Sequence, residues 1–116
     1  MSGAEQAAVD LVHLARYTGG DINLNAEILR LFDSQTSELV ARLQSILDAR
    51  DAKNWKEVIH TLKGAARGIG AFGLADAAAF AEPIDPADRG NAMPALAALR
   101  TQAQDVQGFI RSYLKR

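Results

Sequence analysis

The chain has 116 residues, of which 48% are hydrophobic, and its formal net charge is −1. This length is typical of one domain, so we expect residues 1–116 to form a single domain around one modest core. A net charge this close to zero does not favour binding to nucleic acid or to an anionic membrane surface. The absence of cysteine excludes disulfides and thiolate zinc sites.

The N-terminal ten residues lack a basic segment followed by an apolar run, so the sequence predicts no signal peptide. No stretch of about 18 consecutive apolar residues occurs, so we expect no membrane-spanning helix. A cytoplasmic protein is therefore expected.

Abundant alanine and the lack of alternating β-branched runs favour helices throughout the chain. A short first helix is suggested by Val9, Leu11, Val12, Leu14 and Ala15. It should be stopped by Thr18-Gly19-Gly20-Asp21, because consecutive glycines break helices. A long second helix should cover 25–49, with Asn23 or Asn25 as its N-cap.

The third helix should begin near residue 52, after Asp51 as its cap. A fourth helix is predicted over 72–82, because Pro83 disfavours helix in the residue before it. After a loop over 83–90, the last helix should begin near Asn91, with Pro94 tolerated in its first turn. Amphipathic helices joined by short loops predict an all-α fold, an antiparallel four-helix bundle with a short additional N-terminal helix.

The third helix presents one apolar stripe and one histidine on the opposite side. At about 100° per residue, five apolar residues fall within about 60° of Leu62. These residues are Trp55, Val58, Ile59, Ala66 and Ile69. His60 falls at roughly 160° from Leu62, so its ring should point to solvent. The chain's other histidine, His13, has no such setting and is expected to be structural or merely solvated.

Cations and glycines surround His60 along the same helix. Lys56 lies one turn before it, and Lys63 and Arg67 lie at i+3 and i+7, where helical side chains share a face. Gly64 and Gly68 each cost about 1 kcal/mol relative to alanine inside a helix. This cost indicates that a partner needs close access to the helix surface.

This arrangement suits phosphoryl transfer through the imidazole. A histidine with a pKa of about 6.5 is largely neutral at pH 7, so one ring nitrogen can act as a nucleophile. Lys63 can offset the negative charge of a bound phosphoryl group, and Arg67 can assist it. Phosphoryl transfer depends mainly on positioning and charge stabilisation, which an exposed helix face meeting a partner can provide.

The run His60-Thr61-Leu62-Lys63-Gly64, with Gly70 six residues after Gly64, resembles the His-x-Leu-Lys-Gly signature of histidine-containing phosphotransfer (HPt) domains of two-component phosphorelays. The resemblance extends from about Gly20 to the C-terminus. Outside the motif it rests on residues of the neighbouring helices: Phe32, Leu39, Leu43, Asp51–Trp55, Gly73–Ala75 and Glu82.

The resemblance implies a helical bundle that accepts a phosphoryl group from one receiver-domain aspartate and passes it to another. It implies that His60 is phosphorylated, that Lys63 stabilises the phosphoryl group and that Gly64 provides clearance. Gly68, Arg67 and Lys56 are expected to line the partner surface. Glu82 departs from the family, whose members often have glutamine there. Its carboxylate could orient the imidazole but would repel phosphate.

The same resemblance implies response-regulator receiver domains as partners, with a hybrid histidine kinase as a further candidate. The chain has no recognisable ATP-binding signature of its own, so we expect a phosphorelay intermediate and not a kinase. No cofactor or metal is expected on this chain, and the divalent metal should belong to the receiver. The small size suggests a monomer.

Two other functions compete with this interpretation. A phosphorylation-independent adaptor or inhibitor, binding a receiver domain or histidine kinase, predicts that His60→Gln preserves function. A helical nucleotide-binding enzyme predicts direct ATP binding. The nucleotide-binding enzyme is disfavoured because no strand precedes the glycines at 64, 68 and 70 and no Gly-Lys-Ser/Thr sequence follows them.

The Gly-x-x-x-Gly spacing of 64 and 68 does not indicate a membrane dimer, because Lys63 and Arg67 flank it.

Overall fold

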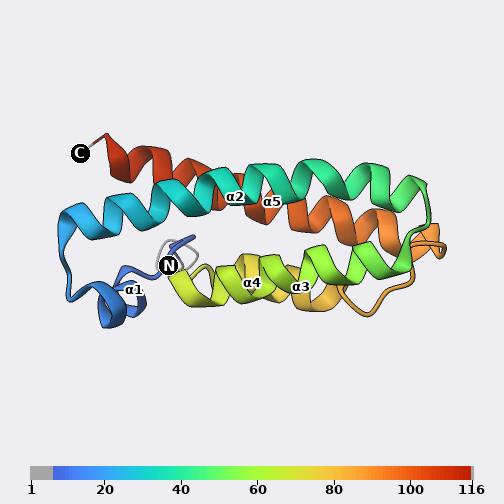
Figure 1. The fold of residues 1–116 in the computed structure, drawn as a ribbon, viewed down its shortest axis with the longest axis horizontal. Helices are drawn as coiled ribbons and strands as arrows, with labels where there is room; N and C mark the ends of the chain where they lie inside the picture. The colour runs from blue at the N-terminus through green and yellow to red at the C-terminus, as the bar shows by residue number, and fades with distance from the viewer. Residues whose placement is uncertain (1–6, 116) are drawn as a thin grey trace.

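A computed structural model describes residues 7–115. Residues 1–6, part of the segment predicted to contain no signal peptide, lie outside this range. Five helices follow one another in the described chain: α1 (Leu11–Thr18), α2 (Ile22–Asp48), α3 (Ala52–Ile69), α4 (Phe72–Ala81) and α5 (Arg89–Leu114). Figure 1 shows α2 beside α5 in one layer and α3 beside α4 in the other. The predicted all-α, antiparallel four-helix bundle with a short extra N-terminal helix is confirmed.

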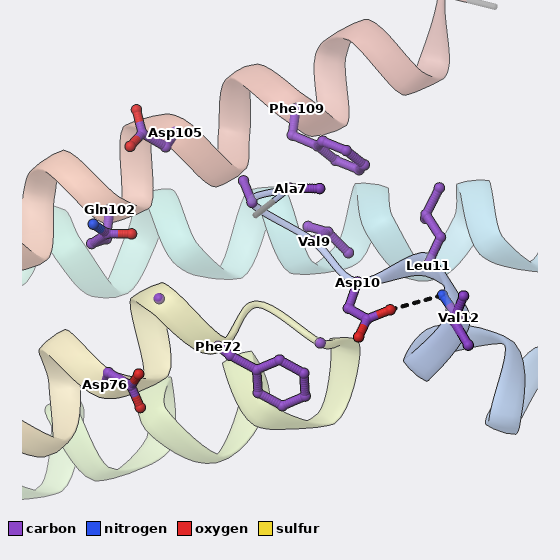
Figure 2. A pocket seen from close by; sticks show the side chains of 13 residues that line it. Ala7, Val9, Asp10, Leu11, Val12, Phe72, Asp76, Gln102, Asp105 and Phe109 are labelled. Atoms are coloured by element: carbon purple, nitrogen blue, oxygen red, sulfur yellow. Dashed lines mark hydrogen bonds between the residues drawn. The ribbon is translucent and has the colours of Figure 1, made fainter. Parts of the chain in front are cut away.

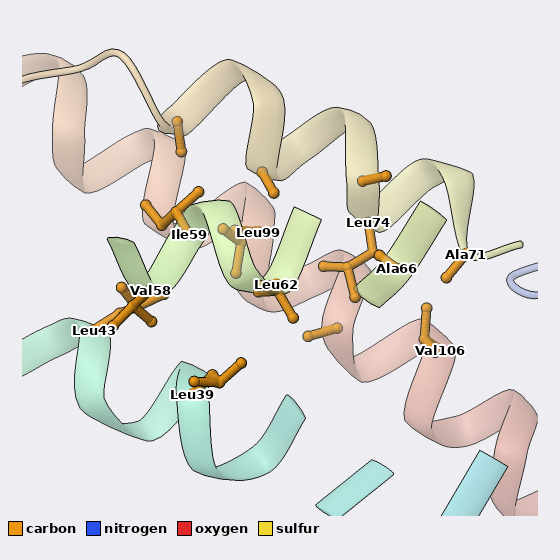
Figure 3. Packing of buried hydrophobic residues seen from close by; sticks show 14 of the residues in the cluster. Leu39, Leu43, Val58, Ile59, Leu62, Ala66, Ala71, Leu74, Leu99 and Val106 are labelled. Carbon is orange, nitrogen blue, oxygen red and sulfur yellow. The ribbon is translucent and has the colours of Figure 1, made fainter. Parts of the chain in front are cut away.

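The core lies where the apolar stripes of α2, α3, α4 and α5 meet (Figure 3). All six apolar residues predicted for the α3 stripe are buried, and Leu62 and Ile59 are fully so. Ala71, Ala75, Ala78 and Ala81 let α4 pack closely on its neighbours, because alanine adds little bulk. The buried stripe of α3 fixes which residues on its opposite face reach solvent.

One buried side chain links α3 to the end of α4. Trp55 is 1% exposed, and its indole Nε1 donates a hydrogen bond of 3.0 Å to the carbonyl oxygen of Ala81. This carbonyl belongs to the last turn of α4, where it also accepts the Ile84 N–H at 3.1 Å from the turn that follows the helix. The bond therefore fixes the position of Glu82, the next residue, against α3.

Two predicted helix starts are wrong. Asp21, and not Asn23 or Asn25, caps α2, its Oδ1 accepting from the Leu24 N–H at 3.0 Å. The helix can begin there because the left-handed Gly19 and Gly20 turn the chain immediately before it. Asn25 is instead buried, and its side chain donates to the Tyr113 hydroxyl.

The last helix begins at Arg89, two residues earlier than predicted. The Asp88 carbonyl already accepts the Ala92 N–H at 2.8 Å, which starts the helical bonding there. Pro94 consequently lies in the second turn of α5 and not in the first. Its missing N–H leaves the carbonyl of Gly90, an exposed residue, without a helical donor, so water can solvate that carbonyl.

The turn between α3 and α4 requires glycine at position 70. Gly70 has φ +86°, and a Cβ atom there would lie 2.7 Å from the carbonyl oxygen of Asp10. The Gly70 carbonyl also accepts the Asp10 N–H at 2.9 Å, which fixes the segment before α1 against this turn. A side chain at position 70 must therefore strain the turn or displace this segment.

We expect Gly70→Ala to lower the free energy of unfolding by about 2 kcal/mol, from the left-handed backbone cost of about 1–2 kcal/mol and the close contact with Asp10. Urea unfolding followed by circular dichroism measures the change. Gly68→Ala is the matched control, because a Cβ there meets nothing within 4 Å. It should raise stability by up to about 1 kcal/mol, since alanine is the better helix former. Equal stabilities of the two variants would contradict this account.

Candidate functional site

His60 lies on the solvent face of α3, opposite the buried stripe. Its side chain keeps 68% of its surface exposed. This orientation agrees with the angle of roughly 160° expected from helical phase. The ring is therefore accessible to another protein.

Glu82 contacts both His60 and Lys63. One carboxylate oxygen, Oε2, lies 3.1 Å from His60 Nδ1, and the other, Oε1, accepts from Lys63 Nζ at 2.6 Å. The side chains of Glu82 and Lys63 are only 13% and 18% exposed. The end of α4 thus places one carboxylate between a ring nitrogen and an ammonium group of α3.

The contact with Glu82 indicates the tautomer of the neutral ring. An ionised carboxylate only accepts hydrogen bonds, so Nδ1 must carry the proton in this contact. The other ring nitrogen, Nε2, then has the free lone pair. The atom able to act as a nucleophile is therefore the one that Glu82 does not bind.

The hydrogen bond from Lys63 is the main cause that lowers the pKa of the Glu82 carboxyl below its ordinary value. Partial burial opposes this change, and the hydrogen bond with His60 adds to it. Glu82 is consequently ionised at neutral pH. A negative charge stands beside the ring of His60, and Lys63 already pairs with it.

An open hollow surrounds the exposed side of the ring. It is lined by Lys56, Glu57, His60, Thr61 and Glu82. Sequence reasoning missed Glu57 and Thr61, although Glu57 stands at i−3 and so shares the face of His60. Thr61 donates from its hydroxyl to the Glu57 backbone carbonyl at 3.0 Å. The hollow thus presents one cation and one carboxylate besides Glu82.

The remaining predicted residues lie farther along the exposed face of α3. Gly64 and Gly68 are exposed, and a Cβ at either position would meet nothing within 4 Å. Arg67 is exposed, two turns after His60. Because Gly64 and Gly68 have no side chains, the backbone of α3 beside His60 is open to a partner.

A second hollow, of about 950 Å³, lies where the segment before α1 meets α4 and α5 (Figure 2). Phe72 and Phe109 line it together with the acidic Asp76 and Asp105. The described lining includes no lysine, arginine or histidine. Without a cation or a nucleophile, this hollow does not suit a phosphoryl group.

Other site chemistries find little support in residues 7–115. No three or more His, Asp or Glu side chains in this range are placed to hold a metal ion. None of its helices is both long and apolar enough to cross a bilayer. His13 is half-buried, with Tyr17 and Phe72 edge-on to its ring at 5.6 and 5.1 Å.

We expect the Glu82 contacts to make the free energy of unfolding depend on pH in the acidic range. Because the pKa of Glu82 is lower in the folded chain than in the unfolded chain, the stabilisation is complete above the unfolded value and is lost as pH falls through the folded value. Urea unfolding should therefore show wild type losing its advantage over Glu82→Gln as pH falls from about 5 to about 2. A difference that is constant across this range would contradict the assigned ion pair.

Comparison with known proteins identifies the family. The family model described as Hpt domain matches residues 27–109. The solved structure of a "putative histidine-containing phosphotransfer protein" from rice superimposes with a TM-score of 0.83 at 18% sequence identity, covering 98% of this chain and 84% of the rice chain. Among curated protein sequences there is no significant match. The family match covers most of the bundle, including His60, and the chain therefore belongs to the Hpt domain family, the histidine-containing phosphotransfer carriers of two-component phosphorelays.

Proposed function

We propose that His60 carries a phosphoryl group between the aspartates of receiver domains. The observation that supports this most strongly is the His60 ring itself, which is 68% exposed and has Nδ1 engaged by Glu82. Nε2 is then the free nucleophile. Hpt domains are phosphotransfer carriers and not kinases, so the phosphoryl group comes from a partner.

In the forward step, the Nε2 lone pair attacks the phosphorus of an aspartyl phosphate. The nitrogen–phosphorus bond forms as the bond to the aspartate oxygen breaks, and the electron pair of that bond returns to the aspartate carboxylate. The reverse step delivers the group to a second receiver. The receiver supplies the acidic pocket and the divalent metal, and this chain supplies the nucleophile and its orientation.

Lys63 is linked to the ring through Glu82, which accepts its hydrogen bond and contacts Nδ1 of His60. An ammonium group has three donors, so Lys63 can keep its bond to Glu82 and donate to a phosphoryl oxygen as well. Lys56, which lines the hollow beside His60, and the exposed Arg67 extend the positive charge along α3 toward an acidic receiver surface.

Gly64 and Gly68 form the low part of the proposed partner surface. Their lack of side chains lets loops of a receiver approach the backbone of α3, and Gly64 lies one turn after the nucleophile. On α2, Ser37 and Gln44 accept hydrogen bonds from Gln107 and Arg100 of α5. We propose that a monomer docks through α3 and the end of α4 to a receiver domain or to a hybrid histidine kinase.

The test is transfer from a receiver domain phosphorylated with labelled phosphate. The proposal predicts that label moves to this chain and forms a bond that is labile in acid and stable in base, as a phosphoramidate bond is. A phosphorylation-independent adaptor, which the negative charge of Glu82 beside the ring would suit, predicts binding without label. Binding without label to receivers that phosphorylate another Hpt domain would overturn the proposal. Direct ATP binding by the isolated chain would indicate the nucleotide-binding alternative.

A further inference from the structure

We infer that Glu82 keeps Nδ1 of the phosphorylated His60 ring protonated, so that the carrier releases its phosphoryl group readily. This inference rests on the proposed function and goes beyond it, because it assigns control of the phosphohistidine lifetime to the C-cap residue of α4.

The contact of Glu82 with the ring carries the inference. Oε2 lies 3.1 Å from Nδ1, and the Glu82 side chain is only 13% exposed although the ring itself is open to solvent. The hydrogen bond from the Trp55 indole to the Ala81 carbonyl oxygen fixes the helix end next to Glu82. A carboxylate in this position favours a proton on Nδ1 far more than a neutral amide would, because its hydrogen bond is charge-assisted.

The proton on Nδ1 determines whether the ring leaves phosphorus as neutral imidazole or as an imidazolate anion. When Nε2 takes the phosphoryl group, the ring keeps its Nδ1 proton and becomes positively charged. When the acceptor carboxylate bonds to phosphorus, the nitrogen–phosphorus electron pair returns to Nε2, and a neutral imidazole leaves. A ring without the Nδ1 proton would have to leave as an imidazolate anion, which is a far poorer leaving group. A carboxylate that holds this proton therefore speeds release.

Four charged groups face the ring in the described structure. Lys56 and Glu57 come from the preceding turns of α3, and they carry opposite charges within one hollow. Lys63 comes from the following turn, and its charge is paired with Glu82, the C-cap residue of α4. No described residue of α2, which packs on the other side of α3, lines the hollow. Glu82 is the group that hydrogen-bonds to Nδ1.

The experiment measures the loss of phosphoryl group from His60 as a function of pH. Two proteins are compared, one with Glu82 and one with Glu82→Gln. Both carry His13→Gln, which leaves His60 as the single histidine, and both are phosphorylated with phosphoramidate. Intact mass then follows the loss of the group between pH 5 and 10. We expect the pH at half-maximal rate to be about one unit lower with Glu82→Gln than with Glu82. At pH values between the two midpoints, release should be several-fold slower in the variant.

Glu57→Gln is the matched control, since it removes a carboxylate of the same hollow for which the described structure gives no bond to the ring. It should shift the midpoint much less than Glu82→Gln does. A slower release with an unchanged midpoint would overturn the inference, because charge repulsion alone would then explain it. If Glu82→Gln folds poorly by circular dichroism, imidazole ¹⁵N shifts of phosphorylated wild type replace it, and a deprotonated Nδ1 at pH 7 would overturn the inference. Failure to phosphorylate His60 at all, by phosphoramidate or receiver, would instead remove the proposed function.

Discussion

Replacing His60 with glutamine is expected to abolish the uptake of phosphoryl groups from a phosphorylated receiver. Glutamine has no nitrogen lone pair that can attack phosphorus, because its amide nitrogen donates hydrogen bonds only. The fold should persist, since 68% of the His60 side chain is exposed and no core contact depends on it. Radiolabel on the chain after gel separation measures the result, and we expect it to fall below detection.

His13→Gln is the matched control for this substitution, because it removes the chain's other histidine. His13 is half-buried beside Tyr17 and Phe72 and lies on α1, so label uptake should stay close to that of wild type. Binding of His60→Gln to the unphosphorylated receiver should also persist. Label that survives in His60→Gln would place the acceptor elsewhere in the chain.

Gly64→Trp should lower the rate of transfer by about 100-fold or more, the loss that a small displacement of reacting groups produces. A Cβ at position 64 points into open space, so an indole there would project from the exposed surface without disturbing the core. The indole would keep a receiver away from Nε2 of His60, which lies one turn before Gly64 on α3. Stopped-flow or quenched-flow transfer from a phosphorylated receiver measures this rate.

Gly108→Trp controls for the general effect of an exposed tryptophan on a helix. Gly108 is exposed on α5, which packs against α2 and α4 and not against α3, and a Cβ there also meets nothing within 4 Å. Transfer by Gly108→Trp should match wild type. Gly64→Ala should retain most of the activity, since one methyl group blocks little. Equal rates for the two tryptophan variants would show that receivers do not approach α3 at Gly64.

The sequence was sufficient to predict the helices and the face of α3 on which His60 lies. The apolar spacing around Leu62 identified the buried stripe correctly, because one helix in isolation decides which residues share a face. Asp51 was correctly predicted as the cap of α3, and Gly19 as a point where a helix ends. These features are local in sequence.

The errors occurred where several local signals competed. Asn23, Asn25 and Asp21 all have side chains able to cap a helix, and periodicity does not decide among them. The start of α5 was placed too late because Pro94 suits a first turn, whereas the structure accepts it in the second. Neither error changes the surface around His60.

The bridge from Lys63 through Glu82 to His60 could not be predicted as a geometry. Glu82 is separated from Lys63 by 19 residues and from His60 by 22, and the turn between α3 and α4 decides whether they meet. The resemblance to the family identified the position of Glu82, but the family's usual glutamine gave no indication that Lys63 would pair with a carboxylate there. The pairing depends on the tertiary contact that Trp55 makes with the end of α4.

The central claim is that Nε2 of His60 is the atom that carries the phosphoryl group, and one NMR measurement tests it directly. The protein, labelled with ¹⁵N in its histidines, is phosphorylated by a receiver domain, and the ¹⁵N–³¹P coupling of each ring nitrogen is recorded. We expect a single coupling, at Nε2 of His60, with Nδ1 still bonded to its proton. Coupling at Nδ1 of His60, or at either nitrogen of His13, would contradict the account.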